Sequence, residues 1–329
     1  MILPENIIKT YPLLPSGKKP LTEEEKLWFT SNEIEQRNKR VIPEIITEFN
    51  VWDKNGIVSA HKHKESNYDR KGRQTSRFSF GYNESQILEE LWKFNENDKL
   101  DEYLRRYIRG EADFTKFIYN KNNKLEKIIR FDLSEYGATT KYLFEYNADD
   151  NVSTIVNIGF DGLPEEITAY TYDANKLLVK KEILNAKKEL IKFFEYKYNA
   201  AKLALQERIF VADGSESSNS VYTYDDFNRL IEKKTQFKTG IELVQNSYEG
   251  EYLISTVKEL IADGKIRKRN EWVADTHNLT VTEKNFSNSI NFEQTIQYDE
   301  NWLPQRGVLK SLNEEIDSYE IRFRTSIHD

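Results

Sequence analysis

The sequence of 329 residues has no cysteine, only seven prolines and thirteen glycines. Without cysteine the chain can form no disulfide, no thiolate metal site and no cysteine nucleophile. It also lacks any apolar run of about 18 residues, which excludes a membrane-spanning helix. A basic excess is missing as well: 48 Lys and Arg against 55 Asp and Glu give a net charge of −7. That balance argues against nucleic-acid binding, which requires a basic surface.

The N-terminal segment shows no export signal. Its first residues, MILPENIIKTYPLL, contain no basic region followed by a continuous apolar stretch. We therefore expect a cytoplasmic protein, with export by a dedicated secretion system as the alternative. Residues 1–44 are expected to form a lead-in. Within it, TEEE at 22–25 matches a capping box, and the apolar spacing that follows predicts a capping helix over 23–38.

An aromatic residue followed by Asp or Asn (a Tyr-Asx dipeptide) recurs through the chain. From residue 68 to residue 224 the successive steps are 26, 25, 27, 26, 26 and 26. Such a regular period is typical of a repeat architecture. The dipeptides are Tyr68-Asp69, Phe94-Asn95, Tyr119-Asn120, Tyr146-Asn147, Tyr172-Asp173, Tyr198-Asn199, Tyr224-Asp225 and Tyr298-Asp299.

Two turns per period leave room for two strands. The Asx side chain can accept a backbone hydrogen bond two residues later, and Asn97, Asn122 and Asn228 tolerate the left-handed region. Glycines such as Gly110, Gly162, Gly214 and Gly240 mark the second turn. Each repeat is therefore predicted to be one β-hairpin. Helical spacing over 100–108 favours a helix there, but the phase of the repeat favours a strand.

The resulting fold class is all-β, with about ten antiparallel hairpin repeats of about 26 residues. They are predicted to form one long curled meander sheet over 45–325, because open sheets beyond about ten strands curl or split. Residues 326–329 remain as a tail. The Tyr-Asx residues are predicted to be structural anchors, one rung per repeat, on the inner face of the sheet.

The segments NYDRKGRQTSRF (67–78), YTYDANKLLVKKEIL (170–184) and VYTYDDFNRLIEKKT (221–235) resemble the YD repeats of Rhs-like polymorphic-toxin proteins. The resemblance implies β-hairpin units that build a shell around a toxin or a surface and adhesion module. It also implies a structural role for the Tyr-Asp positions. A weaker resemblance is to MORN-like antitoxin repeats.

Candidate chemistry is sparse. His61 and His63 have the spacing of a pair on one strand face, as a metal pair needs, but an exposed polar strand is the alternative that we favour. No phosphate loop, nucleophile elbow or marked carboxylate pair occurs. We expect no catalytic residues, no cofactor and no enzymatic activity.

These features predict a protein-binding repeat module of a bacterial toxin or secretion system, either an immunity protein or an effector-associated scaffold. The acidic balance suits a basic toxin or effector as the protein partner. The alternative is a carbohydrate-binding cell-surface YD-repeat module, whose aromatic rings would stack on sugars.

Overall fold

The computed structural model describes residues 43–54, 57–81, 83–132, 138–287, 291–311 and 319–327. Every regular element in these residues is a β-strand, so the all-β prediction is confirmed for them. They include no helix long and apolar enough to cross a membrane. The predicted helix over 23–38, and nearly all of the lead-in at 1–44, lie outside the described residues.

The chain divides into two compact units. Unit 1 holds 88–245 and 258–267, and unit 2 holds 43–87, 246–257 and 268–327. The strands in chain order are β1 (Pro43–Lys54), β2 (Ile57–Tyr68), β3 (Gln74–Phe80), β4 (Gln86–Phe94), β5 (Leu100–Tyr107), β6 (Ala112–Tyr119), β7 (Leu125–Asp132), β8 (Ala138–Tyr146), β9 (Val152–Ile158), β10 (Pro164–Tyr172), β11 (Leu178–Asn185), β12 (Leu190–Tyr198), β13 (Ala204–Val211), β14 (Glu216–Tyr224), β15 (Leu230–Phe237), β16 (Gly240–Glu249), β17 (Tyr252–Ala262), β18 (Lys265–Asp275), β19 (Thr280–Phe286), β20 (Phe292–Tyr298), β21 (Pro304–Ser311) and β22 (Tyr319–Ile327).

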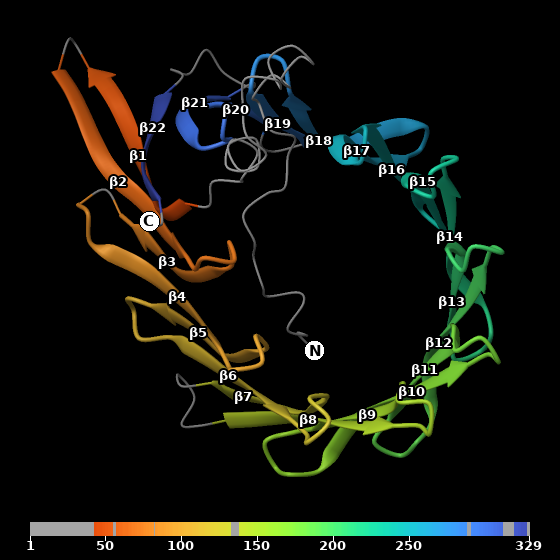
Figure 1. The fold of residues 1–329 in the computed structure, drawn as a ribbon. Coiled ribbons are helices and arrows are strands. Elements are labelled where there is room, and N and C mark those ends of the chain that lie inside the picture. Colours follow the sequence, from red (N-terminus) through yellow and green to blue (C-terminus); the bar gives the residue numbers. More distant parts are fainter. Residues whose placement is uncertain are drawn as a thin grey trace, which may run out of the picture. The chain divides into compact units, whose positions relative to one another are not determined.

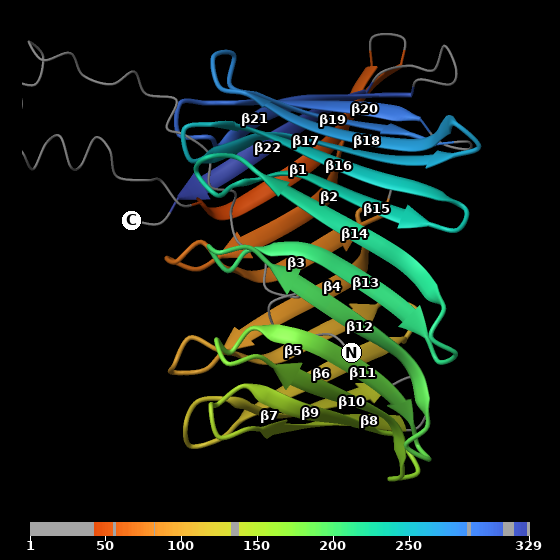
Figure 2. The ribbon, with the colours of Figure 1, turned by 90° about the vertical axis from the view of Figure 1, so that its right-hand side faces the viewer.

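Unit 1 is a continuous antiparallel run in which each strand from β4 to β15 pairs with the next one along the chain. Figures 1 and 2 show these strands side by side, with their turns at two opposite edges. The segment at 100–107, where spacing also allowed a helix, is strand β5. The short helical spacing of apolar residues does not produce a helix here, because this segment pairs with β4 on one side and β6 on the other.

The turn after each Tyr-Asx dipeptide has one geometry, and these turns form what we call the Asx edge of unit 1. In the turn at 147–151, the Asn147 side-chain Oδ1 accepts hydrogen bonds from the backbone N–H of Asp149 and Asn151, both at 3.0 Å. The N–H of Asp150 donates to the Asn147 carbonyl at 3.0 Å. The predicted hydrogen bond to the second residue is thus present, with a further one to the fourth.

The left-handed residue of each Asx turn is the third after the Asx. Asn228 has a φ of 63°, as the sequence predicted, but in the first two turns of unit 1 the residues are Asp98 and Asn123 rather than Asn97 and Asn122. A type I turn closed by a left-handed residue is a common three-residue hairpin loop. In two repeats this position is held by a lysine, Lys176 or Lys202, with φ of 64° and 63°.

Replacing Lys202 by glycine should raise the free energy of unfolding by about 1 kcal/mol, because the left-handed region disfavours a residue with a Cβ. Urea denaturation of the variant and the parent protein would measure the change. The matched control is Ala201→Gly one residue earlier, which is not left-handed and should lose stability. Equal effects of the two substitutions would contradict the assigned turn geometry.

The opposite edge of unit 1 is the glycine edge, formed by the second turn of each repeat. Gly110, Gly162 and Gly214 adopt φ of 98°, 80° and 81°, as their turn position predicts. Lys188 takes the same place, with a φ of 65°, in the repeat that has no glycine. Gly240 differs: it begins β16, and a Cβ at this position would lie 2.3 Å from the carbonyl oxygen of Ile261.

In unit 2 the strands pair in the order β18, β19, β20, β21, β22, β1, β2 and β3. Strand β1 lies between β2 and β22 (Figure 1): Ile46 faces Ser66 of β2 on one side and Thr325 of β22 on the other. The prediction of one long curled meander sheet is therefore wrong, because the first and last strands are hydrogen-bonded to each other. The physical reason is that this pairing satisfies backbone groups which an unpaired edge strand would expose.

Candidate functional site

The predicted tyrosine anchors form a hydrogen-bonded ladder on one face of unit 1. Each hydroxyl donates to the backbone carbonyl of a residue at the start of a preceding strand, about 20 residues earlier. These bonds are Tyr119 to Leu100 (2.8 Å), Tyr146 to Leu125 (2.7 Å), Tyr172 to Val152 (2.7 Å), Tyr198 to Leu178 (2.8 Å) and Tyr224 to Ala204 (2.9 Å). We call this face, defined by these five tyrosines, the aromatic face.

The ladder tyrosines are half-buried. Burial is the first cause that raises the pKa of Tyr146, Tyr172, Tyr198 and Tyr224. A tyrosine hydroxyl is already protonated at neutral pH, and the raised pKa extends the alkaline range over which it remains a hydrogen-bond donor. Each ladder tyrosine thus combines a half-buried ring with a polar bond to the first residue of a preceding strand.

The residue two places before a ladder tyrosine packs on the same face. Phe117 and Phe144 are 1% and 9% exposed and belong to one buried cluster. Trp92, Leu100, Ile128 and Ile155 complete this cluster. Trp92 stands two places before the dipeptide Phe94-Asn95 and so holds the same repeat position as Phe117 and Phe144. Ile128 and Ile155 occupy strand positions that the Tyr-Asx period does not mark.

A groove of about 740 Å³ runs over part of this face. Its walls include the rings of Tyr119, Tyr146 and Tyr172, and its lining includes the buried side chains Leu100 and Phe144. The groove crosses strands from β5 to β11, all within unit 1. Its volume lies within the range of about 300–1,000 Å³ that is usual for ligand pockets. An aromatic, apolar hollow of this size can accept apolar side chains or a flat ring.

Charged residues at the Asx edge border the groove. The Lys124 Nζ lies 3.0 Å from the Asp150 Oδ1 and 5.2 Å from the centroid of the Tyr146 ring. In the next pair of turns Lys176 forms an ion pair with Asp149 at 2.9 Å. These pairs join successive Asx turns. Because they are partly exposed, each adds little stability. Lys124 and Asp150, which line the groove, place charge of both signs at its rim.

Farther along the aromatic face, Glu207 lies next to two tyrosines. The Tyr222 hydroxyl donates to the Glu207 Oε2 at 3.0 Å, and Tyr196 is paired with Glu207 across β12 and β13. Burial, followed by the negative charge of Glu207, raises the pKa of both tyrosines well above its ordinary value. On the same face burial lowers the pKa of Lys181, whose Nζ lies 4.6 Å from the Phe194 ring centroid.

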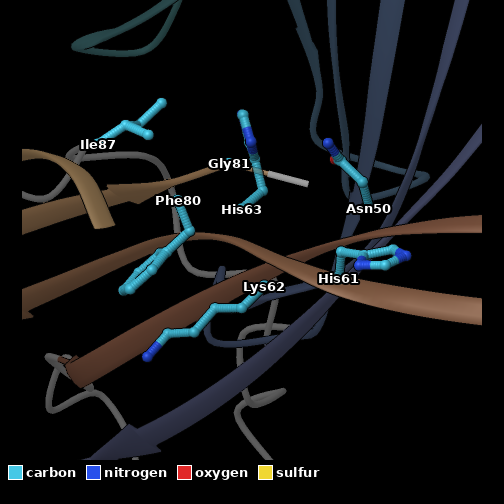
Figure 3. Close-up of a pocket in the computed structure, with 7 residues that line it drawn as sticks. All are labelled: Asn50, His61, Lys62, His63, Phe80, Gly81 and Ile87. Atoms are coloured by element: carbon cyan, nitrogen blue, oxygen red, sulfur yellow. The ribbon is translucent and has the colours of Figure 1, made fainter. Parts of the chain in front are cut away.

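The two histidines singled out by the sequence lie in unit 2 on β2. They line a pocket of about 330 Å³ together with Asn50, Phe80 and other residues, and Figure 3 shows their side chains pointing in different directions. The His63 Nε2 lies 4.0 Å from the Glu48 Oε1. Desolvation and the neighbouring Lys64 lower the pKa of His63, while Glu48 opposes them.

A metal ion at His61 and His63 would need further ligands. In the described part of the chain, no group of three or more His, Asp or Glu residues is arranged to hold a metal ion. The Lys62 Nζ in the same pocket lies 4.5 Å from the Phe80 ring centroid. The pocket thus combines partly exposed polar and aromatic side chains.

No family model matches the sequence, and no curated protein matches it. Solved structures that resemble it include the Tc holotoxin pore of Photorhabdus luminescens, with 12% identity over 85% of this chain and 18% of that chain and a TM-score of 0.28. The TcdB2–TccC3 complex without its hypervariable C-terminal region has 12% identity over 86% of this chain and 19% of that chain, with a TM-score of 0.30. A porin-like protein from Bacteroides uniformis has 11% identity over 88% of this chain and 99% of that chain, with a TM-score of 0.32.

This chain therefore spans about a fifth of the length of the two toxin chains. At these identities and TM-scores, the three likenesses carry no argument about function.

Proposed function

We propose that this protein is a non-enzymatic protein-binding repeat module of a bacterial toxin or secretion system, serving as an immunity protein or an effector-associated scaffold. The observation that carries the binding role is the groove of about 740 Å³ on the aromatic face of unit 1. The toxin setting comes from the resemblance of the Tyr-Asx repeats to YD repeats.

The groove has the character of a protein-binding surface. Tyrosine is enriched at interfaces, because its ring supplies contact area and its hydroxyl a polar bond. Here the hydroxyls of Tyr119, Tyr146 and Tyr172 are already bonded to backbone carbonyls. The rings are thereby held in place before a partner arrives, and preorganised side chains lower the entropy cost of association.

The charge of the chain suggests the kind of partner. A net charge of −7 speeds association with a basic protein and opposes association with an acidic one. A basic toxin or effector with apolar side chains in its contact surface would match both the groove and the charge.

The substitution Tyr170→Lys should abolish capture of the partner by placing a charge in the groove, which Tyr170 lines. The matched control is Thr171→Lys. Thr171 is the exposed neighbour on the opposite face of β10, so this substitution should leave capture unchanged. The measurement is affinity purification of the tagged full chain from its native host at physiological salt, with circular dichroism to verify folding. Loss of the same partner from both variants, or from neither, would contradict binding in the groove.

The carbohydrate alternative has one supporting observation, the aromatic rings along the groove, since a sugar can stack on a tyrosine ring. A glycan array separates the two proposals. If the protein binds a glycan, loses that binding in Tyr170→Lys and captures no protein partner, sugar binding would replace protein binding as the proposed function.

A further inference from the structure

Unit 2 contains a separate cavity of about 280 Å³. Five aromatic rings contribute to its lining: those of Tyr68, Trp272, Tyr298, Trp302 and Phe323. Trp302 is 4% exposed, and its ring centroid lies 5.4 Å from that of Tyr298. The cavity therefore has aromatic walls, contributed by segments that are far apart in the sequence.

The charges at this cavity have one sign. Its lining includes two carboxylates, those of Glu48 and Glu283, and no Lys, Arg or His. The Glu48 Oε1 lies 3.7 Å from the Lys64 Nζ, so its charge is partly balanced. The Glu283 carboxylate forms no ion pair or hydrogen bond with any described residue. Glu283 is exposed to solvent, and the positive charge of Arg77, which lies outside the lining, acts on Tyr68. The lining thus carries an exposed carboxylate without a partner among the described residues, beside aromatic rings.

Strand pairing fixes where Glu283 lies. Its Cα partners are Trp272 of β18 and Gln294 of β20, so Glu283 stands between two other residues of the lining. Its charge also reaches Tyr298: burial and then Glu283 raise the pKa of that phenol. The Tyr298 hydroxyl bonds to no described residue, unlike the hydroxyls of the ladder tyrosines in unit 1.

We propose that this cavity binds the ammonium group of a compact organic cation. Tyr and Trp faces attract a cation held within about 6 Å of the ring centroid, and a carboxylate without a partner adds a charge-assisted contact. The ammonium group can come from a lysine side chain of another protein or from a free quaternary amine. The site lies in unit 2 and does not rest on the function proposed for the groove of unit 1.

Isothermal titration of the full-length protein tests this site with three probes: choline, N-acetyl-lysine methylamide, and the neutral choline isostere 3,3-dimethylbutanol. We expect one of the two cations to bind, and the neutral isostere to bind at least about tenfold more weakly. Binding of choline alone indicates a free quaternary amine as the ligand, and binding of the lysine derivative indicates a protein side chain. Equal binding of the isostere, or no binding of either cation at millimolar concentration, overturns the proposal.

Two matched variants locate the binding. Glu283→Gln should weaken cation binding about tenfold, while Glu293→Gln should not. Glu293 is a neighbouring carboxylate on β20 that is paired with Lys284 at 2.9 Å and does not line the cavity. Trp272→Leu should weaken binding as well, through loss of a ring rather than a charge. Unchanged binding in both cavity variants, with their circular dichroism intact, overturns the assignment.

Discussion

Replacing Tyr198 by alanine should lower the free energy of unfolding by about 3 kcal/mol. The substitution removes a half-buried ring, and aromatic truncations in packed positions cost about 3–5 kcal/mol. It also removes the donor that bonds the Leu178 carbonyl at 2.8 Å. Urea denaturation followed by circular dichroism measures the change.

Two other variants separate packing from hydrogen bonding. Tyr198→Phe keeps the ring and loses only the hydroxyl, so it should cost about 1 kcal/mol. Lys197→Ala changes the exposed neighbour on the opposite face and should stay within about 0.5 kcal/mol. A loss below about 0.5 kcal/mol for Tyr198→Ala would mean that the ladder adds no packing, and would favour the carbohydrate alternative.

A disulfide between β1 and β22 should stabilise the protein by about 5–6 kcal/mol. Thr47 and Arg324 are Cα partners in this pairing, and replacing both by cysteine would close a loop of roughly 280 residues, for which chain entropy gives a gain of this size. Since the chain has no cysteine of its own, the new bond would have no competing thiol. Urea denaturation with and without reductant measures the gain.

The control for the disulfide shifts the register by one residue. Thr325 is paired with Ile46 instead and lies on the other face of β22, so Thr47→Cys with Thr325→Cys should form the bond poorly. Non-reducing electrophoresis separates the looped chain from the open one. If the shifted pair were to crosslink as readily as the matched pair, the register of β1 and β22 would be refuted.

The local structure could be predicted from the sequence because its causes are local. Each repeat contains a tyrosine followed by Asp or Asn, then turn residues, then an aliphatic residue. This short motif determines both the turn and the first residues of the next strand. The repeat phase therefore identified β5 despite its helical spacing. The left-handed position was missed by one residue at Asn97 and Asn122, since the next residue in each turn, Asp98 or Asn123, is of the same kind.

The long-range structure could not be predicted in this way. The pairing of β1 with β22 joins residues near opposite ends of the chain, and no periodic signal records it. The cavity of unit 2 depends on the same pairing, because Glu48 and Phe323 come from these two strands. The pairing of β18 with β19 places Trp272 beside Glu283, and no sequence pattern marks that contact.

The tyrosine ladder also determines where the chain can change in length. The bond from Tyr119 spans 19 residues and that from Tyr146 spans 21, yet each ends at the first residue of a strand, and the Asx turns between them have the same geometry. Differences in repeat length are thus absorbed toward the glycine edge. Insertions during evolution, and peptide tags or grafted loops in engineering, should therefore be accommodated in the glycine-edge turns and rejected in the Asx turns.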